Sequence, residues 1–187
     1  MLLGACTSLG VVDKTAALDA TQHSIFVLGV APDNYKISVF PGSVRNGVFR
    51  QNPWLPATVY GSGEDGYLVG EASAGDTLAI TMIRVLKDKN SIFGTTFFVP
   101  CNGKKTMTFS IPGGKVLYLG NVSYEFAGTF LKVKYSQDID SARKYMDKNY
   151  PNLRGRLESW KYQLLPTTAS CAVGIPIYIP IYIPAGR

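Results

Sequence analysis

Few residues of this chain have the types and spacing that catalysis requires. The sequence contains one histidine, His23, and any Ser-His-Asp or Cys-His mechanism would have to use it. A histidine at the start of an apolar run is more often exposed than catalytic. Residues 61–66 fit the pattern G-x-G-x-x-G, but an expected strand follows instead of the helix that a dinucleotide site needs, and Glu64 and Asp65 would repel a phosphate. We read this segment as a loop between strands.

Carboxylate and metal chemistry have equally little support. A pair such as Glu64 with Asp76 would suit glycoside hydrolysis, yet an Asp in a hairpin loop is usually a turn former. The chain has no Cys-x-x-Cys, no histidine pair and no Asp-x-Asp-x-Asp loop. We therefore expect no catalytic residue, no metal site and no cofactor, and the sequence favours a protein that is not an enzyme.

The most specific chemical signal is Leu3-Gly4-Ala5-Cys6. It resembles a bacterial lipobox, in which small residues let a peptidase approach the bond before a Cys that becomes lipidated. A complete signal peptide also has a basic region and about 7–15 apolar residues before the cleavage site, so the resemblance implies a start upstream of Met1. The alternative is a Cys in an ordinary frayed chain end.

As a lipobox, the motif implies a diacylglycerol on the thiol of Cys6 and an acyl chain such as palmitate on its amine. Two or more acyl chains hold a protein durably at a membrane. Thr7 stands where Gram-negative inner-membrane retention signals have Asp, which implies an outer-membrane lipoprotein facing the periplasm. Residues 1–23 would then be the lipobox remnant and a flexible tether.

The other two cysteines have two open interpretations. With Cys6 lipidated, Cys101 and Cys171 remain as an even pair in an oxidising compartment, where disulfides persist. A disulfide closing a loop of this length would stabilise the fold by roughly 4 kcal/mol. The alternative is two separate buried thiols, because free Cys is among the most buried residue types.

Composition places the chain among globular proteins. Of its 187 residues, 46% are hydrophobic and 17% are charged, which predicts one folded domain, and no apolar run reaches the roughly 18 residues of a membrane-spanning helix. The formal net charge is +6, but the basic residues are scattered, so no nucleic-acid partner is expected. A solvated basic surface is one interpretation; a surface resting on anionic phospholipid or polysaccharide is the other.

Short apolar or alternating runs, separated by Gly and Pro, predict a mainly β protein. The expected strands lie near residues 24–30, 35–40, 58–60, 67–72, 77–84, 93–99, 106–111, 116–122, 131–135 and 157–165. Seven or more such strands predict an antiparallel β-sandwich, immunoglobulin-like or prealbumin-like, over residues 24–170. Trp160 and Tyr162 would share one face of the last strand.

One α-helix is expected near residues 138–149. Asp138 is a good N-cap, and Ile139, Ala142 and Met146 would form an apolar stripe. Tyr150 precedes a proline and is therefore disfavoured in the helical conformation, so the helix should end there.

The tail, residues 171–187, repeats Pro-Ile-Tyr-Ile. Its prolines remove backbone donors from one edge of an extended strand, which suits a terminal edge strand covering the sandwich. The alternative is an exposed arm that binds a partner. The side chains available to a partner would be Ile177, Tyr178, Ile179, Ile181, Tyr182 and Ile183.

The overall pattern resembles envelope lipoproteins of bacteria that carry a small β-sandwich domain. The segments that carry the resemblance are residues 65–70 (DGYLVG), 74–77 (AGDT), 112–121 (PGGKVLYLGN) and the helix that ends in 150–153 (YPNL). The resemblance implies a fold and a location without an activity. We expect a non-catalytic, lipid-anchored envelope protein that contacts the membrane through its anchor, and other envelope proteins or peptidoglycan through its surface.

The alternative function is a carbohydrate-binding or peptidoglycan-binding module. Aromatic rings exposed on one face of a sandwich can stack on sugars, although most aromatic residues of such a fold lie in its core. The candidates are Tyr60, Tyr67, Tyr118, Tyr124 and Trp160.

Overall fold

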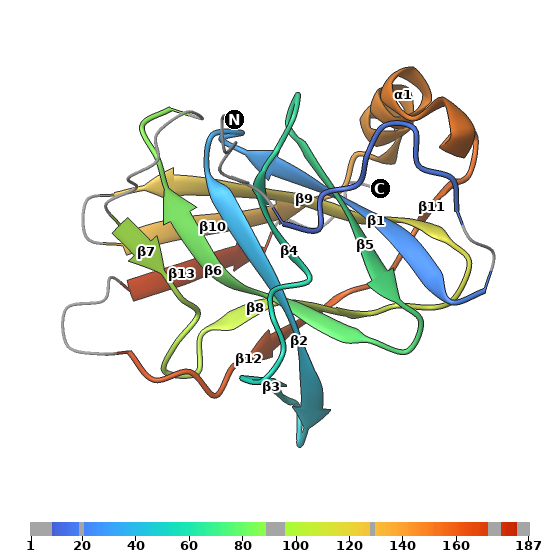
Figure 1. Cartoon of the computed structure of the whole chain (residues 1–187). Coiled ribbons are helices and arrows are strands. Elements are labelled where there is room, and N and C mark those ends of the chain that lie inside the picture. Colours follow the sequence, from blue (N-terminus) through green and yellow to red (C-terminus); the bar gives the residue numbers. More distant parts are fainter. Residues whose placement is uncertain (1–8, 19–20, 89–95, 128–129, 172–176, 183–187) are drawn as a thin grey trace, which may run out of the picture.

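The computed structural model describes residues 9–18, 21–88, 96–127, 130–171 and, for the backbone, 177–182. Two β-sheets pack face to face, and one α-helix covers the outer face of the first sheet (Figure 1). The expected mainly β sandwich with a single α-helix is therefore confirmed for this part of the chain.

The first sheet has the strand order β13-β10-β9-β1-β5, and β11 also pairs with β9. Its strands are β1 (His23–Ala31), β5 (Tyr67–Ser73), β9 (Val116–Phe126), β10 (Phe130–Ser136), β11 (Leu157–Ser159) and β13 (Ile177–Tyr182). The β1–β9, β9–β11 and β10–β13 pairs are parallel. The sandwich is thus mixed, whereas the sequence predicted antiparallel pairing throughout.

The second sheet has the strand order β12-β8-β6-β2-β3, with β4 beside β2 and β7 beside β6. Its strands are β2 (Lys36–Arg45), β3 (Val48–Gln51), β4 (Val59–Ser62), β6 (Thr77–Val85), β7 (Thr96–Phe98), β8 (Lys105–Ser110) and β12 (Gln163–Pro166). All of its strand pairs are antiparallel.

Strand β1 is buried on both faces, which explains why its sequence is an unbroken apolar run. Phe26 and Leu28 point into the core between the two sheets. Ile25 and Val27 point to the other side, into a second core beneath the helix. Successive side chains of a strand alternate between faces, so a strand covered on both sides needs apolar residues at every position.

Helix α1 (Ile139–Asn149) begins and ends where the sequence predicts. The side chain of Asp138 accepts a hydrogen bond from the backbone N–H of Ser141 over 3.1 Å, which makes it the N-cap. Ala142, Tyr145 and Met146 are buried against the first sheet. Tyr150 is the C-cap, and the 3₁₀ turn η1 (Pro151–Leu153) follows.

The expected strand over residues 157–165 is two strands in different sheets. β11 lies in the first sheet and β12 in the second, so the chain crosses between the sheets at residues 160–162. Trp160 and Tyr162 are both partly buried against the core between the sheets. The Trp160 indole donates a hydrogen bond to the carbonyl of Ser110 over 2.8 Å, which fixes this crossing.

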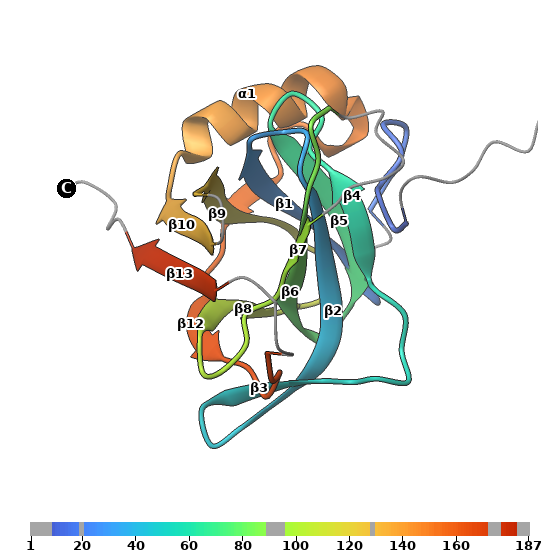
Figure 2. The ribbon, with the colours of Figure 1, turned by 90° about the vertical axis from the view of Figure 1, so that its left-hand side faces the viewer.

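Residues 9–18 contact the sandwich, whereas the sequence predicted a lipobox remnant and a flexible tether over residues 1–23. The backbones of Leu9 and Tyr60 exchange two hydrogen bonds of 2.8 and 2.9 Å, and Val12 N–H donates to the Val69 carbonyl over 3.0 Å. Tyr60 belongs to the second sheet and Val69 to the first. The N-terminal segment therefore bridges the two sheets along one side of the sandwich, opposite β13 (Figure 2).

Gly10 makes this close approach possible. Its φ is +66°, and a Cβ at this position would lie 1.9 Å from the carbonyl oxygen of Thr58. Only glycine accommodates both the left-handed backbone and the neighbouring chain.

Candidate functional site

Two adjoining grooves lie beside the N-terminal segment, on one side of the molecule. The first, which we call the N-terminal groove, has a volume of about 630 Å³ and lies between residues 10–16, the loop at residues 52–58 and the start of β1. The second, which we call the hairpin groove, has a volume of about 360 Å³ and runs along β2 and β3. Pro41, Leu55 and Asp76 line both grooves, so the two are continuous.

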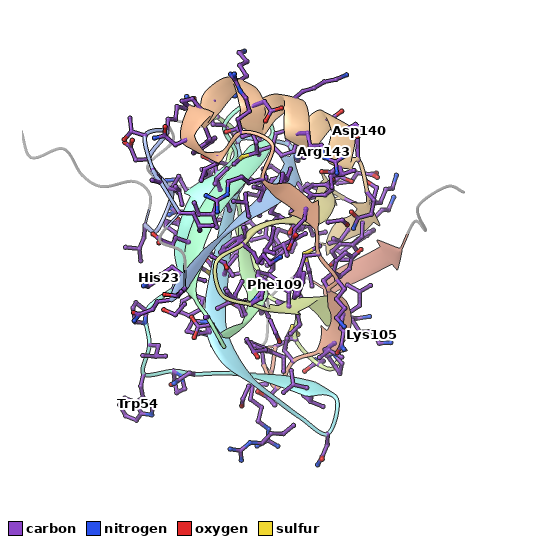
Figure 3. All side chains as sticks on the ribbon, turned by 90° about the vertical axis from the view of Figure 1, so that its right-hand side faces the viewer. His23, Trp54, Lys105, Phe109, Asp140 and Arg143 are labelled. Carbon is purple, nitrogen blue, oxygen red and sulfur yellow. A yellow bond between two sulfur atoms is a disulfide. The ribbon has the colours of Figure 1, made fainter. Side chains whose placement is uncertain are left out.

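The loop at residues 52–58, which lines both grooves through Leu55, also holds an exposed tryptophan. Asn52 N–H donates to the carbonyl of Pro41, and Thr58 N–H donates to the carbonyl of Val39, each over 2.9 Å, so both ends of the loop are fixed to β2. The Asn52 side chain accepts a hydrogen bond of 3.0 Å from the backbone N–H of Trp54. The Trp54 side chain is 90% exposed. It points away from the body of the protein on the side where His23 lies (Figure 3).

The charged residues of the N-terminal groove make local contacts. His23 Nδ1 lies 4.0 Å from Glu71 Oε1, and Asp76 accepts the backbone N–H of Ser73 over 3.2 Å within a hairpin turn. Asp13 accepts hydrogen bonds from the side chain and backbone of Thr15, which lower the pKa of the Asp13 carboxyl. These contacts shape turns and strand ends, and they do not align a nucleophile with a base.

The Glu64 and Asp76 carboxylates have separate structural roles. Asp76 lines the N-terminal groove. Glu64 instead accepts a hydrogen bond of 2.6 Å from Lys14, which ties the N-terminal segment to the turn before β5. This ion pair raises the pKa of Lys14.

Within the described ranges, no three His, Cys, Asp or Glu side chains are placed to hold a metal ion. No helix among the same residues is long and apolar enough to cross a membrane.

The structure joins Cys101 and Cys171 in a disulfide, with their Cα atoms 5.2 Å apart. Cys101 is fully buried, and Asn102 beside it donates its backbone N–H to the carbonyl of Ala169 over 3.0 Å. The bond therefore attaches the chain after β12 to the turn before β8. Cys6, the expected lipidation site, lies outside the described residues.

The repeat in the tail pairs with the sheet. Residues 177–182 form β13, the edge strand of the first sheet, in parallel register with β10. This arrangement agrees with the edge-strand interpretation of the tail. Ile177, Tyr178, Ile179, Ile181 and Tyr182 belong to this strand, while Ile183 lies outside the described residues.

Two of the five rings considered for sugar stacking are core residues. Tyr118 and Tyr124 are 0% and 5% exposed, because both point into buried clusters. The other three rings are partly buried and already contact other residues of the protein. Tyr60 accepts a hydrogen bond from Arg84, Tyr67 stacks on Tyr145, and the Trp160 indole donates a hydrogen bond to the Ser110 carbonyl. The most exposed of the large hydrophobic side chains described is Trp54, which was not among the sequence candidates. The sequence around it, Asn-Pro-Trp-Leu-Pro, could have identified Trp54. Prolines on both sides indicate a loop, where an aromatic side chain is less easily buried in the core.

Comparison with known proteins found no match to this chain among family models, curated proteins or solved structures.

Proposed function

We propose that this protein is a non-catalytic, lipid-anchored protein of the bacterial cell envelope that acts through contacts of its surface. The observation that carries the proposal is the disulfide between Cys101 and Cys171. Disulfides persist in oxidising compartments such as the periplasm and are rare in the cytosol. The chain has three cysteines, so the bond leaves Cys6 as the remaining thiol, in the motif that resembles a lipobox.

The experiment is expression of the gene from its native start in a Gram-negative host with radioactive palmitate. We expect a labelled product in the outer-membrane fraction, and Cys6→Ser should abolish the label. A matched variant, Cys6→Ser with Ser8→Cys, moves the thiol out of the motif and should also remain unlabelled. An unlabelled, cytoplasmic product with reduced Cys101 and Cys171 would overturn the proposal.

The outer-membrane location has its own test in Thr7. Replacing Thr7 with Asp would place an acidic residue directly after the lipidated Cys, where it resembles an inner-membrane retention signal. We expect Thr7→Asp to move the labelled protein to the inner-membrane fraction, while Thr7→Ser should leave it in the outer membrane. An unchanged location of Thr7→Asp would contradict the sorting part of the proposal.

A second candidate function is binding of carbohydrate or peptidoglycan. The observation that favours it is Trp54, which is 90% exposed and precedes Leu55, the loop residue that lines both grooves. Exposed tryptophan rings can stack on sugar faces. The test is a titration with soluble peptidoglycan fragments and a glycan array. Trp54→Ala should abolish binding and Trp160→Phe should preserve it, whereas an array without hits would remove this candidate.

A further inference from the structure

We infer that the side of the sandwich formed by the N-terminal segment and the loop at residues 52–58 rests on the lipid bilayer, with Trp54 at the level of the headgroups. This inference rests on the proposed function, because it takes Cys6 as the anchored residue. It adds which face of the domain meets the membrane and which side chains make that contact.

The first argument is the short chain between the anchor and the sandwich. Leu9 is hydrogen-bonded to Tyr60 of β4, and three peptide units separate it from Cys6. Consecutive Cα atoms are about 3.8 Å apart, so the Cα atoms of Leu9 and Cys6 are at most about 11 Å apart. A lipid on Cys6 therefore holds Leu9, and whatever surrounds it, close to the bilayer surface.

The second argument is the apolar character of this side. Four large apolar side chains of the N-terminal segment and of the loop at residues 52–58 are exposed, and together we call them the anchor face. They are Leu9 (50%), Val11 (42%), Trp54 (90%) and Leu55 (48%). Val11 and Leu55 line the same groove, so the N-terminal segment and the loop are neighbours on this surface. An exposed apolar patch of this kind marks a contact site.

The third argument is the suitability of tryptophan for the membrane interface. The indole ring combines a large apolar surface with one N–H donor, and tryptophan is enriched at the headgroup level of bilayers. The loop that holds Trp54 has both ends bonded to β2, so the ring is presented by a fixed support. Insertion of the ring into the headgroup region would remove its apolar surface from water, which is favourable.

The charges on this side play a secondary part. Arg45 and Arg50 line the hairpin groove and can reach anionic headgroups, while Asp13 and Glu71 line the N-terminal groove. Because both signs are present, we expect binding to depend only modestly on the fraction of anionic lipid. The position of the anchor and the four apolar side chains carry the inference.

The opposite side of the molecule then faces away from the membrane. The first sheet runs from β5, beside the N-terminal segment, to β13 at its other edge. Figure 2 shows the N-terminal segment on the right and β13 on the left. The anchored domain would thus present the β10–β13 edge to the periplasm.

The test uses the full chain coupled to vesicles through Cys6. Cys101 and Cys171 are bonded to each other, so Cys6 is the thiol that reacts with a maleimide lipid. Trp160→Phe leaves Trp54 as the one tryptophan, since the chain has two. On vesicles of phosphatidylethanolamine and phosphatidylglycerol, Trp54 emission should shift to shorter wavelengths and be quenched by lipids brominated near the headgroup.

The matched control places the reporter at the other side. In Trp54→Phe, Trp160→Phe, Phe126→Trp, the tryptophan stands at a position that is 43% exposed in the wild-type protein, at the end of β9 beside β10. Its emission should be unchanged by vesicles and quenched by aqueous iodide. Circular dichroism of each variant checks that the sandwich is folded.

The outcomes separate the two proposals. Vesicle-bound protein whose Trp54 remains accessible to iodide and unquenched by brominated lipid would overturn the anchor face. A Trp54 signal that responds to soluble peptidoglycan fragments and not to vesicles would overturn it in favour of carbohydrate binding. Because the lipid is attached chemically, both results are independent of whether cells lipidate Cys6, which the palmitate experiment decides.

Discussion

The hydroxyl of Tyr118 accepts the backbone N–H of Asp138 over 2.9 Å and donates to the side chain of Asn121 over 2.8 Å. Tyr118 lies in β9, and Asp138 is the N-cap of α1. One buried phenol therefore links the central sheet to the residue that starts the helix. This contact sets the position of α1 over the first sheet.

Tyr118→Phe should destabilise the protein by about 1–3 kcal/mol, because two part-buried hydrogen bonds, to the Asp138 N–H and the Asn121 oxygen, are lost while the ring remains. Urea unfolding followed by circular dichroism measures this difference. Tyr67→Phe is the control: it keeps the ring that stacks on Tyr145 and should cost less. Equal stability of Tyr118→Phe and the wild type would contradict the assigned role.

Alkaline pH should weaken the fold through the same residue. Burial raises the pKa of Tyr118 to about 12, above the value of about 10 for an ordinary tyrosine. The folded state holds this proton more tightly, so its stabilising contribution is complete below pH 10 and is lost as the pH rises towards 12. The free energy of unfolding should fall over this interval, and less steeply in Tyr118→Phe. A parallel pH dependence of the two proteins would contradict the assignment.

Asp138→Ala should lower the free energy of unfolding, since it removes the side chain that caps α1 at Ser141. Hydrogen bonds from the side chain and the backbone N–H of Ser141 lower the pKa of Asp138. Their contribution to stability is present above the ordinary carboxyl pKa and is lost as the pH falls through the lowered value. Asp140→Ala, in the first turn, is the matched control with a smaller expected loss. Thermal denaturation at pH 7 and pH 2 should show the difference between the variants at pH 7 only.

Loss of the disulfide should lower the free energy of unfolding by roughly 4 kcal/mol. Cys101 and Cys171 are separated by 70 positions, and closing a loop of this length restricts the unfolded chain. Guanidinium unfolding of Cys101→Ser with Cys171→Ser measures the loss. Cys6→Ser should match the wild type. If the double variant is as stable as the wild type, the bond does not restrain the fold.

Gly10→Ala should release the N-terminal segment, because a Cβ would lie 1.9 Å from the carbonyl oxygen of Thr58. Amide hydrogen exchange at Val12 and Tyr60 should then accelerate, since both donate hydrogen bonds in this contact. Gly47→Ala shares a positive φ, of +73°, but its Cβ would meet no atom within 4 Å. It should leave these two amides protected. Unprotected amides in the wild type would contradict the bridging segment.

Local patterns in the sequence located the helix and most strands. Asp138 lies directly before α1, and Tyr150 with the proline after it lies directly behind the helix. These local signals therefore predicted both ends of α1. The alternation of strand residues likewise needs no distant partner. Strand β3, which only two residues separate from β2, was missed because four residues carry little periodicity.

Features that depend on distant partners could not be predicted. Residues 9–18 look like a linker, and their contacts are with Tyr60 and Val69. Residues 157–165 look like one strand because the pattern does not show that each half meets a different sheet. The grooves combine segments from the N-terminus, β1, β2 and the loop at residues 52–58, and Trp54 becomes a candidate only once that surface exists.

The bridge between Leu9 and Tyr60 also governs how far the domain can travel from a fixed Cys6. While the bridge holds, the reach is that of three peptide units. Residues 9–22 would become free chain if a pull away from the anchor opened this pair and the other contacts of the segment. These include the Val12–Val69 and Ala74–Gln22 backbone bonds, the Lys14–Glu64 ion pair and the hydrogen bond from Asn152 to Thr15. Extended chain spans about 3.3–3.6 Å per residue, so the freed segment would reach at most about 45–50 Å. Under a pulling force, the segment would then detach and lengthen the linker to Cys6, while β1 and the rest of the sandwich stay folded.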